Sequence, residues 1–338
     1  MISLVDRIDE NSKIPKYLQV VKLFENDIES GIFKYGQKIP SINETSESYY
    51  LSRDTVEKAY NELKNRGIIK PVRGKGYYVT SLETNHVIKV LLLFNKLSTH
   101  KKNVYYSLIA SLGKKAKVDL QIYHYDFNFF CNILKNNLGD YDYYVVMPHF
   151  NTPHDNLKEE LSQIPADKLI LLDKKIDGIK YQSCVYQDFE RDILDALRDG
   201  EELFYKYTKL CLVFPQSSLH PVEIVKGFVI FCKIMSLDYS VVNSINQEIV
   251  KSGSAYIVIE ESDLVDVIKS CNTQKLKLGK DVGLISYNDT PLKEVLADGI
   301  TVISTNFDMM GETVGKLILE KKKENVRNPF RLIRRKSC

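Results

Sequence analysis

Long apolar runs, paired cysteines and a strong net charge are all missing from this sequence of 338 residues. No run of about 18 apolar residues occurs, so we expect no membrane span. The first residues, MISLVDRIDENSK, contain no apolar segment of the kind found in secretory signals. The six cysteines stand singly, without CxxC or cysteine–histidine spacing, which indicates reduced thiols. Together these absences predict a cytoplasmic protein, and the net charge of +3 by itself does not predict a nucleic-acid partner.

Motifs of the common catalytic classes are absent as well. The sequence contains no GxSxG, no P-loop GK[ST] and no HExxH. The RGKG at 73–76 lies in a predicted hairpin turn and not before a helix, so it is not a phosphate loop. His149 and His154 stand five apart around a loop, which is weak support for a metal pair. We therefore expect no enzyme, no metal site and no cofactor.

Residues 1–80 have the pattern of one small unit. Pro15 precedes a helix with apolar residues at helical spacing, which ends near Gly31. Ser41, with glutamate three residues later, has the pattern of a capping box, and Ser52 is a second N-cap before RDTVEKAYNELKNRG. The strand pair IIKPV and YYVT follows, joined by RGKG. Three helices and a hairpin in this order predict a winged helix-turn-helix.

Candidate DNA contacts lie at two places in this unit. Ser52, Arg53 and Thr55 begin the third helix, where a recognition helix meets bases and phosphates. Arg73 and Lys75 flank a glycine in the hairpin turn, which suits a wing tip beside the DNA backbone. Each group has a plainer interpretation, because Ser52 is also a helix cap and RGKG is also an ordinary exposed turn.

The run from Pro15 to Val79 resembles the DNA-binding domain of GntR-family regulators. The resemblance is carried by Ile39-Pro40-Ser41, Ser52-Arg53-Asp54-Thr55-Val56, Ala59-Tyr60 and Gly74-Lys75-Gly76. It implies DNA contacts from a set of recognition-helix and wing residues: Ser52, Arg53, Thr55, Arg73, Gly74 and Lys75. Asn43 is a further candidate, although many members of the family have arginine there.

Beyond a predicted linker at 81–87, short apolar strands alternate with amphipathic helices. The predicted strands are 88–94, 118–125, 141–149, 168–173, 208–214, 238–243, 255–260, 282–288 and 300–305. Near-continuous apolar strands with helical crossovers indicate parallel sheets that are covered on both faces. We therefore predict an α/β fold with two doubly wound lobes after the winged helix-turn-helix.

The stretch DVGLISYNDTPLKEVLADGITVISTNFDMMGETVGKLILE is similar to LacI-family effector domains, which are periplasmic-binding-protein-like. The final PFRLIRRKSC resembles the terminal strand of that family. These resemblances imply a two-lobed effector domain at 88–338, with one lobe at about 88–186 and 305–327 and the other at about 187–304 and 328–338. A GntR head joined to a LacI-like sensor is the combination found in arabinose-type repressors.

Ligand candidates are the polar or aromatic residues near strand carboxyl ends, where such domains bind ligand. They are Asn95, Lys96, Asp173, Tyr186, Gln187, His220, Glu261, Asn288 and Asp289. For each of them, a helix cap or a surface position is the competing interpretation. Ile224 stands where the resembling sugar sensors often carry an arginine that clamps ligand hydroxyls.

The sequence thus predicts a ligand-responsive transcription regulator. We expect a homodimeric repressor of carbohydrate-utilisation genes that binds double-stranded operator DNA. A monosaccharide, such as a pentose or deoxyhexose of the arabinose or fucose type, would release it. The alternative is a DNA-binding protein whose α/β domain only dimerises or senses a metabolite other than a sugar.

Overall fold

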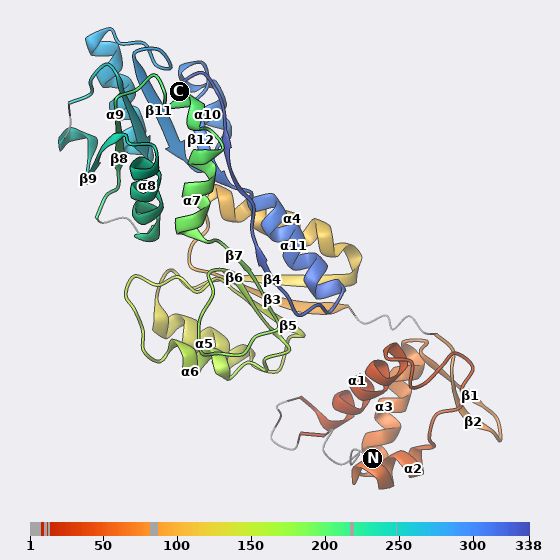
Figure 1. Ribbon diagram of the computed structural model, residues 1–338. Helices are drawn as coiled ribbons and strands as arrows, with labels where there is room; N and C mark the ends of the chain where they lie inside the picture. Colours follow the sequence, from red (N-terminus) through yellow and green to blue (C-terminus); the bar gives the residue numbers. More distant parts are fainter. Residues whose placement is uncertain (1–7, 10–11, 13, 82–86, 217–219, 248) are drawn as a thin grey trace. The chain divides into compact units, whose positions relative to one another are not determined.

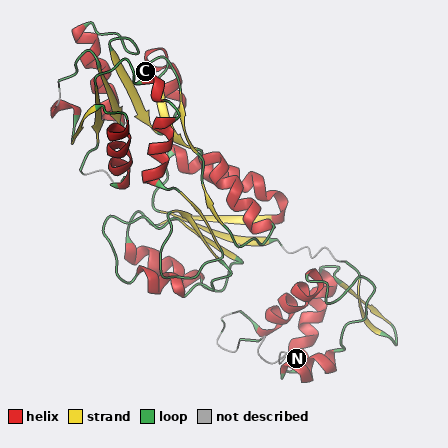
Figure 2. Ribbon diagram, viewed as in Figure 1, coloured by secondary structure: helices red, strands yellow, loops and turns green. Residues whose placement is uncertain are grey.

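The computed structural model describes residues 8–9, 12, 14–81, 87–216, 220–247 and 249–338 (Figure 1). Figure 2 separates its helices, strands and loops by colour. Among these residues no helix is both long enough and apolar enough to cross a membrane. The predicted linker at 81–87 lies mostly outside the described residues.

The N-terminal head contains three helices and a hairpin, as predicted. They are α1 (Lys16–Glu29), α2 (Ile42–Tyr49), α3 (Arg53–Asn65), β1 (Ile69–Val72) and β2 (Gly76–Val79). Ser41 and Glu44 form the predicted capping box, since the Ser41 Oγ accepts from the Glu44 amide at 3.2 Å and the Glu44 carboxylate accepts from the Ser41 amide at 2.6 Å. Ser52 caps α3 by accepting from the Thr55 amide at 3.3 Å. Both predicted N-caps are therefore confirmed.

Tyr60 on α3 is the centre of the head's core. Its side chain is fully buried, and its ring meets the rings of Phe24 and Tyr77 edge-on, with centroid distances of 5.5 and 4.9 Å. Its hydroxyl donates to the Pro40 carbonyl at 2.6 Å and lies 2.8 Å from the Thr45 hydroxyl. Because Pro40 precedes α2 and Thr45 is on it, these bonds set the angle between α2 and α3.

Two six-stranded sheets form the α/β part of the chain. The first sheet has the order β13 (Asn325–Arg327), β7 (Ser183–Tyr186), β6 (Leu169–Asp173), β5 (Tyr143–Val146), β3 (Ile88–Phe94), β4 (Ala116–Ile122). The second has the order β14 (Phe330–Ile333), β12 (Thr301–Thr305), β11 (Val282–Tyr287), β10 (Ser254–Val258), β8 (Lys209–Val213), β9 (Asp238–Val242). We call the two sheets with their helices the first and second lobes. The pairings of β8 through β12 are parallel, and only the terminal β14 runs antiparallel to its neighbour β12 in that sheet.

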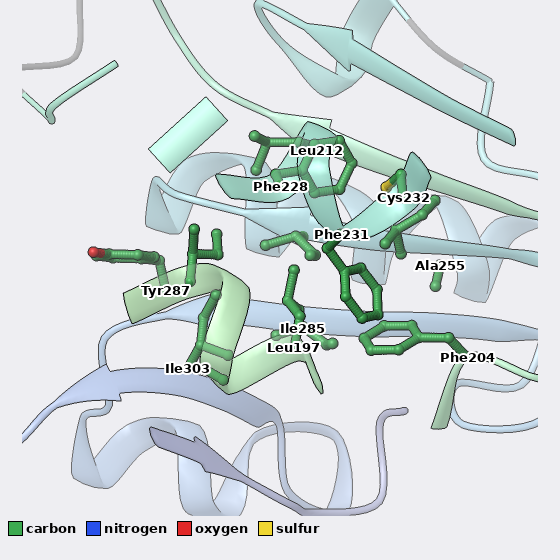
Figure 3. Packing of buried hydrophobic residues seen from close by; sticks show 14 of the residues in the cluster. Leu197, Phe204, Leu212, Phe228, Phe231, Cys232, Ala255, Ile285, Tyr287 and Ile303 are labelled. Atoms are coloured by element: carbon green, nitrogen blue, oxygen red, sulfur yellow. The ribbon is translucent and has the colours of Figure 1, made fainter. Parts of the chain in front are cut away.

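The helices of this part are α4 (Thr99–Leu112), α5 (Phe127–Asn137), α6 (Leu157–Ser162), α7 (Phe189–Arg198), α8 (Glu223–Ile234), α9 (Glu261–Gln274), α10 (Pro291–Val295) and α11 (Phe307–Leu319). Helix α8 approaches α7 closely at Gly227, where a Cβ would lie 2.1 Å from the Glu190 carbonyl oxygen. In the second lobe, apolar side chains of α7, α8 and the sheet pack together (Figure 3). Phe204 and Phe231 meet edge-on there at 5.3 Å, and Tyr287 lies at the margin with its hydroxyl directed away from them.

The chain passes between the sheets at three crossovers. The first follows β7 at residues 187–188, the second lies at the end of β12 at residues 305–306, and the third joins β13 to β14 at residues 328–329. Each of the predicted strands overlaps an observed one, and β14 begins in the predicted terminal segment. The short strands β7 and β13 were not predicted, because four and three residues carry too little periodicity.

Candidate DNA-binding surface and effector site

The start of α3 presents the predicted recognition-helix residues. Arg53 is exposed at the first helical position, and Ser52 is exposed immediately before it. The Ser52 hydroxyl serves the helix as its cap and also lies 2.8 Å from the Thr55 hydroxyl. The guanidinium of Arg53 is therefore the group best placed to reach outward from this end of the helix.

The hairpin brings a second set of cations to a narrow turn. The Lys75 amide donates to the Val72 carbonyl at 2.9 Å, and Gly74 has φ +73°, a value that disfavours side chains with a Cβ. Arg73, Gly74 and Lys75 are exposed at the turn. Lys38, which we did not predict, pairs with β2 through a bridge to Tyr78 and adds a cation beside the wing. Its signal in the sequence was its place in the KIPS segment before α2.

Asn43 lies exposed on α2 beside the capping box. The turn between α2 and α3 passes through Tyr50, which has φ +52° and an exposed fraction of 81%. Asn43 as a DNA contact stays a prediction.

In the first lobe, Asp173 is the centre of a hydrogen-bonded group at the strand ends. It ends β6 with φ +75°, and its Oδ2 lies 2.6 Å from Nε2 of His149. Its Oδ1 accepts from the side-chain amide of Gln187. Burial would raise the pKa of Asp173, but the bonds from His149 and Gln187, with the nearby ammonium of Lys101, hold it below its ordinary value. Asp173 is thus an ionised, nearly enclosed acceptor.

Tyr123 holds the backbone of His149 in place. The Tyr123 hydroxyl donates to the Met147 carbonyl at 2.6 Å and accepts from the His149 amide at 3.0 Å. His154, by contrast, stacks on Phe127 with a centroid distance of 4.2 Å. The two histidines therefore have different partners and do not form a pair. Among the described residues, no group of three or more histidine, cysteine or acidic side chains could hold a metal ion. The sequence analysis considered His149 only for a metal pair. It did not predict the contact with Asp173, because the two residues stand 24 positions apart.

Buried Asn95 and half-buried Lys101 form a second pair in this lobe. Asn95 is 3% exposed, and its side-chain oxygen accepts from the Lys101 ammonium. Burial lowers the pKa of Lys101 to about 8, although the charge of Asp173 opposes this shift. Lys96, the neighbouring prediction, is exposed. Sequence reasoning missed Lys101 because it lies within α4 and not at a strand end.

In the second lobe, Asn288 follows β11 with φ +58°. Its side-chain oxygen is buried and has no hydrogen-bond partner among the described residues. Lys293, 3% exposed, donates to the Asn288 carbonyl at 2.7 Å and the Tyr287 carbonyl at 3.0 Å, which fixes this strand end. Both carboxylate oxygens of Asp289 accept hydrogen bonds from the Arg335 guanidinium, at 2.8 and 2.7 Å. This predicted ligand residue is therefore engaged within its own lobe.

The carboxyl ends of the two sheets face one another. His220 of the second lobe packs edge-on to Tyr287 at 5.4 Å. Burial lowers its pKa, and the charges of Lys96, Asp173 and His149 in the first lobe also act on it. Three of the predicted ligand residues, Lys96, Asp173 and His220, therefore lie close enough across the two sheet ends to interact electrostatically.

Two of the remaining predicted residues, Tyr186 and Gln187, already contact neighbouring side chains. The Tyr186 ring is covered on one face by the Lys175 ammonium, 3.5 Å from its centroid. Gln187 bonds to Asp173 through its amide nitrogen and accepts from Thr305 through its oxygen. Glu261 is exposed at the start of α9. Ile224 is fully buried in the core of the second lobe, so its side chain is no substitute for a ligand-clamping arginine.

Two depressions on the lobes lie apart from these residues. One of about 480 Å³ is lined by residues 166–167, 176–181 and 323. Another of about 420 Å³ is lined by Glu190, Val222, Val225, Lys226, Val229 and Ile230. Neither is lined by a predicted ligand residue.

Comparison with known proteins separates the chain into two matched parts. Residues 16–79 match the bacterial regulatory proteins of the gntR family, and residues 236–338 match the periplasmic binding protein-like domain. The chain joins a gntR-type DNA-binding head to a periplasmic-binding-protein-like domain. The two resemblances inferred from the sequence motifs are thereby confirmed, and so is the predicted fold class.

Individual relatives and solved structures resemble this chain over one part or the other. The HTH-type transcriptional repressor YtrA of Bacillus subtilis is 38% identical over 74 residues, which cover 22% of this chain and 57% of YtrA. The arabinose metabolism transcriptional repressor of Geobacillus stearothermophilus is 37% identical over 67 residues, covering 20% of this chain and 18% of that one. The trehalose repressor of Escherichia coli superimposes with a TM-score of 0.59 at 14% identity, covering 73% of this chain and 100% of that one.

The chain spans less than two thirds of each curated relative, and the trehalose repressor establishes the fold of the α/β part alone. The two curated relatives are named as repressors, which agrees with the prediction that this protein is not an enzyme.

Proposed function

We propose that this protein is a cytoplasmic, ligand-responsive repressor of carbohydrate-utilisation genes that a monosaccharide releases from DNA. Residues 1–80 bind the operator and residues 88–338 bind the effector in this proposal. A homodimer places two heads on a near-palindromic operator. A pentose or deoxyhexose is the effector class that we propose, by analogy with arabinose-type repressors.

One observation carries the effector part of the proposal. Asn288 offers a buried side-chain oxygen that lacks a partner among the described residues, while Asp173 and His149 lie at the opposing strand ends. A buried acceptor without a donor is costly unless a ligand or water supplies one. Sugar hydroxyls donate and accept in turn, so they suit a site with an amide, a carboxylate and an imidazole.

On the DNA side, Arg53 and the wing residues Arg73 and Lys75 support operator binding. Arginine at the start of a recognition helix can pair with guanine, and wing cations can neutralise phosphates. The effector then acts by changing how the lobes close about the three crossovers, which alters the spacing of the heads. Coupling between such sites is typically about 1–3 kcal/mol.

The test has two parts. An operator is first selected from a pool of random duplexes with the full-length chain. Calorimetry then measures binding of L-arabinose, D-xylose, D-ribose, L-fucose, L-rhamnose, D-glucose and D-galactose, and each sugar that binds is added to the operator complex. We expect at least one sugar to bind and to weaken operator affinity about 5- to 150-fold.

Two results would count against this function. Operator binding that no sugar in the panel changes would favour a domain that only dimerises or senses another metabolite. If the chain enriches no specific duplex from the random pool, the assignment as a transcription regulator is itself wrong. Light scattering of the free chain tests the homodimer separately.

A further inference from the structure

Gln187 occupies the first crossover, directly after β7 and before α7. Its side chain is engaged at both ends, because the amide nitrogen donates to Oδ1 of Asp173 and the amide oxygen accepts from the hydroxyl of Thr305. Its backbone amide also donates to the Asp173 carbonyl at 3.1 Å. The predicted role of Gln187 as a direct ligand contact would therefore require one of these bonds to break.

Thr305 is the last residue of β12 and is 4% exposed. It belongs to the second lobe's sheet, while Asp173 belongs to the first lobe's sheet. The bonds Asp173–Gln187–Thr305 thus run from the proposed effector site to the second crossover. Gln187 is the link between them, since an amide can donate at one end and accept at the other.

The three crossovers are also tied to one another through the backbone. The Asn306 amide donates to the Pro329 carbonyl at 2.9 Å, and the Asn328 amide donates to the Tyr186 carbonyl at 2.7 Å. The Asn328 side chain donates to the Asn306 carbonyl at 3.1 Å. A change at Thr305 therefore has a direct route to the other crossovers.

We infer that Gln187 is a positioning residue that transmits occupancy of Asp173 to the crossovers. This inference rests on the proposed effector function. A ligand hydroxyl that donates to the Asp173 carboxylate competes with the Gln187 amide for the same oxygens. When the Gln187 amide loses its bond to Asp173 and rotates, the hydrogen bond that it accepts from Thr305 weakens. The second crossover can then move as the lobes close.

The experiment uses the full-length chain without ligand and measures amide hydrogen exchange at Asn306 and Asn328. Gln187→Met keeps the side-chain length and removes both hydrogen bonds, while Thr305→Val keeps the branched shape and removes the hydroxyl. We expect each variant to speed exchange at these amides about three- to tenfold, the effect of one lost hydrogen bond. The double variant should exchange no faster than the faster single variant, because both changes break one relay.

Gln182 supplies the matched control. It is 7% exposed, and its side chain donates to the Lys321 carbonyl at 3.1 Å, away from the crossovers. Gln182→Met should leave exchange at Asn306 and Asn328 unchanged. Additive acceleration in the double variant, no acceleration in either single variant, or equal acceleration by Gln182→Met would each overturn the relay.

A second arm adds L-arabinose, and then each sugar of the panel that binds. With wild type, a bound sugar should alter exchange at Asn306. With Thr305→Val, which leaves the proposed effector residues in place, the sugar should still bind, but the change at Asn306 should disappear. If the change persists, the transmitting role is wrong. If no sugar binds, the proposed effector class is wrong, while the ligand-free measurements still decide the relay.

Discussion

Replacing Lys101 by methionine should make the protein more stable at neutral pH. The half-buried Lys101 ammonium donates to Asn95, an uncharged partner, and its removal from water lowers its pKa from 10.5 to about 8. That difference corresponds to on the order of 3 kcal/mol of unfavourable interaction for the charged form. Methionine keeps the aliphatic stem and removes the charge, but it also removes the hydrogen bond to Asn95, worth about 1 kcal/mol. We therefore expect a gain of about 1–2 kcal/mol in the free energy of unfolding at pH 7.

The pH dependence gives a second, independent signature. Below pH 8 the lysine is charged in both folded and unfolded chains, so the folded state bears the whole cost. Between about pH 8 and 10.5 the folded state releases the proton while the unfolded state retains it, so this group's contribution to stability rises with pH. Lys101→Met should lack that rise, and its advantage over wild type should shrink toward pH 10.

Urea unfolding of both proteins at pH 7 and 9.5 measures these differences. Lys102→Met is the matched control, because Lys102 is the exposed neighbour on the same helix. We expect its midpoint to equal that of wild type at both pH values. A Lys101→Met protein that is less stable than wild type at pH 7, or that keeps the wild-type pH dependence, would refute the reasoning. A stabilised variant with weakened sugar binding would show that the buried charge is retained for function.

Four other changes test separate parts of the molecule. Arg53→Ala should weaken operator binding by about 1–3 kcal/mol, and an unchanged gel-shift titration would remove its proposed contact. Tyr60→Phe removes the hydroxyl that joins α2 to α3 and should lower head stability by about 1–2 kcal/mol in thermal melts. Gly227→Ala should destabilise the second lobe by more than 2 kcal/mol, since its Cβ would lie 2.1 Å from the Glu190 carbonyl oxygen, and a wild-type melt would contradict that packing. Asn288→Gly keeps the positive φ and should abolish sugar binding in calorimetry while operator affinity stays intact.

Local signals in the sequence were enough to predict the head. Helix caps at Ser41 and Ser52 depend on residues three positions away, and glycine marks the tight turn at Gly74. The apolar strands of both lobes were also visible, because burial on both faces requires continuous apolar runs. These features depend on neighbours in the chain, so the order of the residues alone determined them.

The functional contacts of the α/β part depended on tertiary structure instead. Asp289 fits the pattern of a ligand residue, yet Arg335, 46 positions away, takes both of its carboxylate oxygens. Gln187 meets Thr305 across 118 positions and becomes a link between lobes. The sequence by itself therefore determined which residues stand near strand ends. Only the fold decided which of those polar groups satisfy one another and which, like the Asn288 side-chain oxygen, have no partner among the described residues, because hydrogen bonds depend on proximity in space and not along the chain.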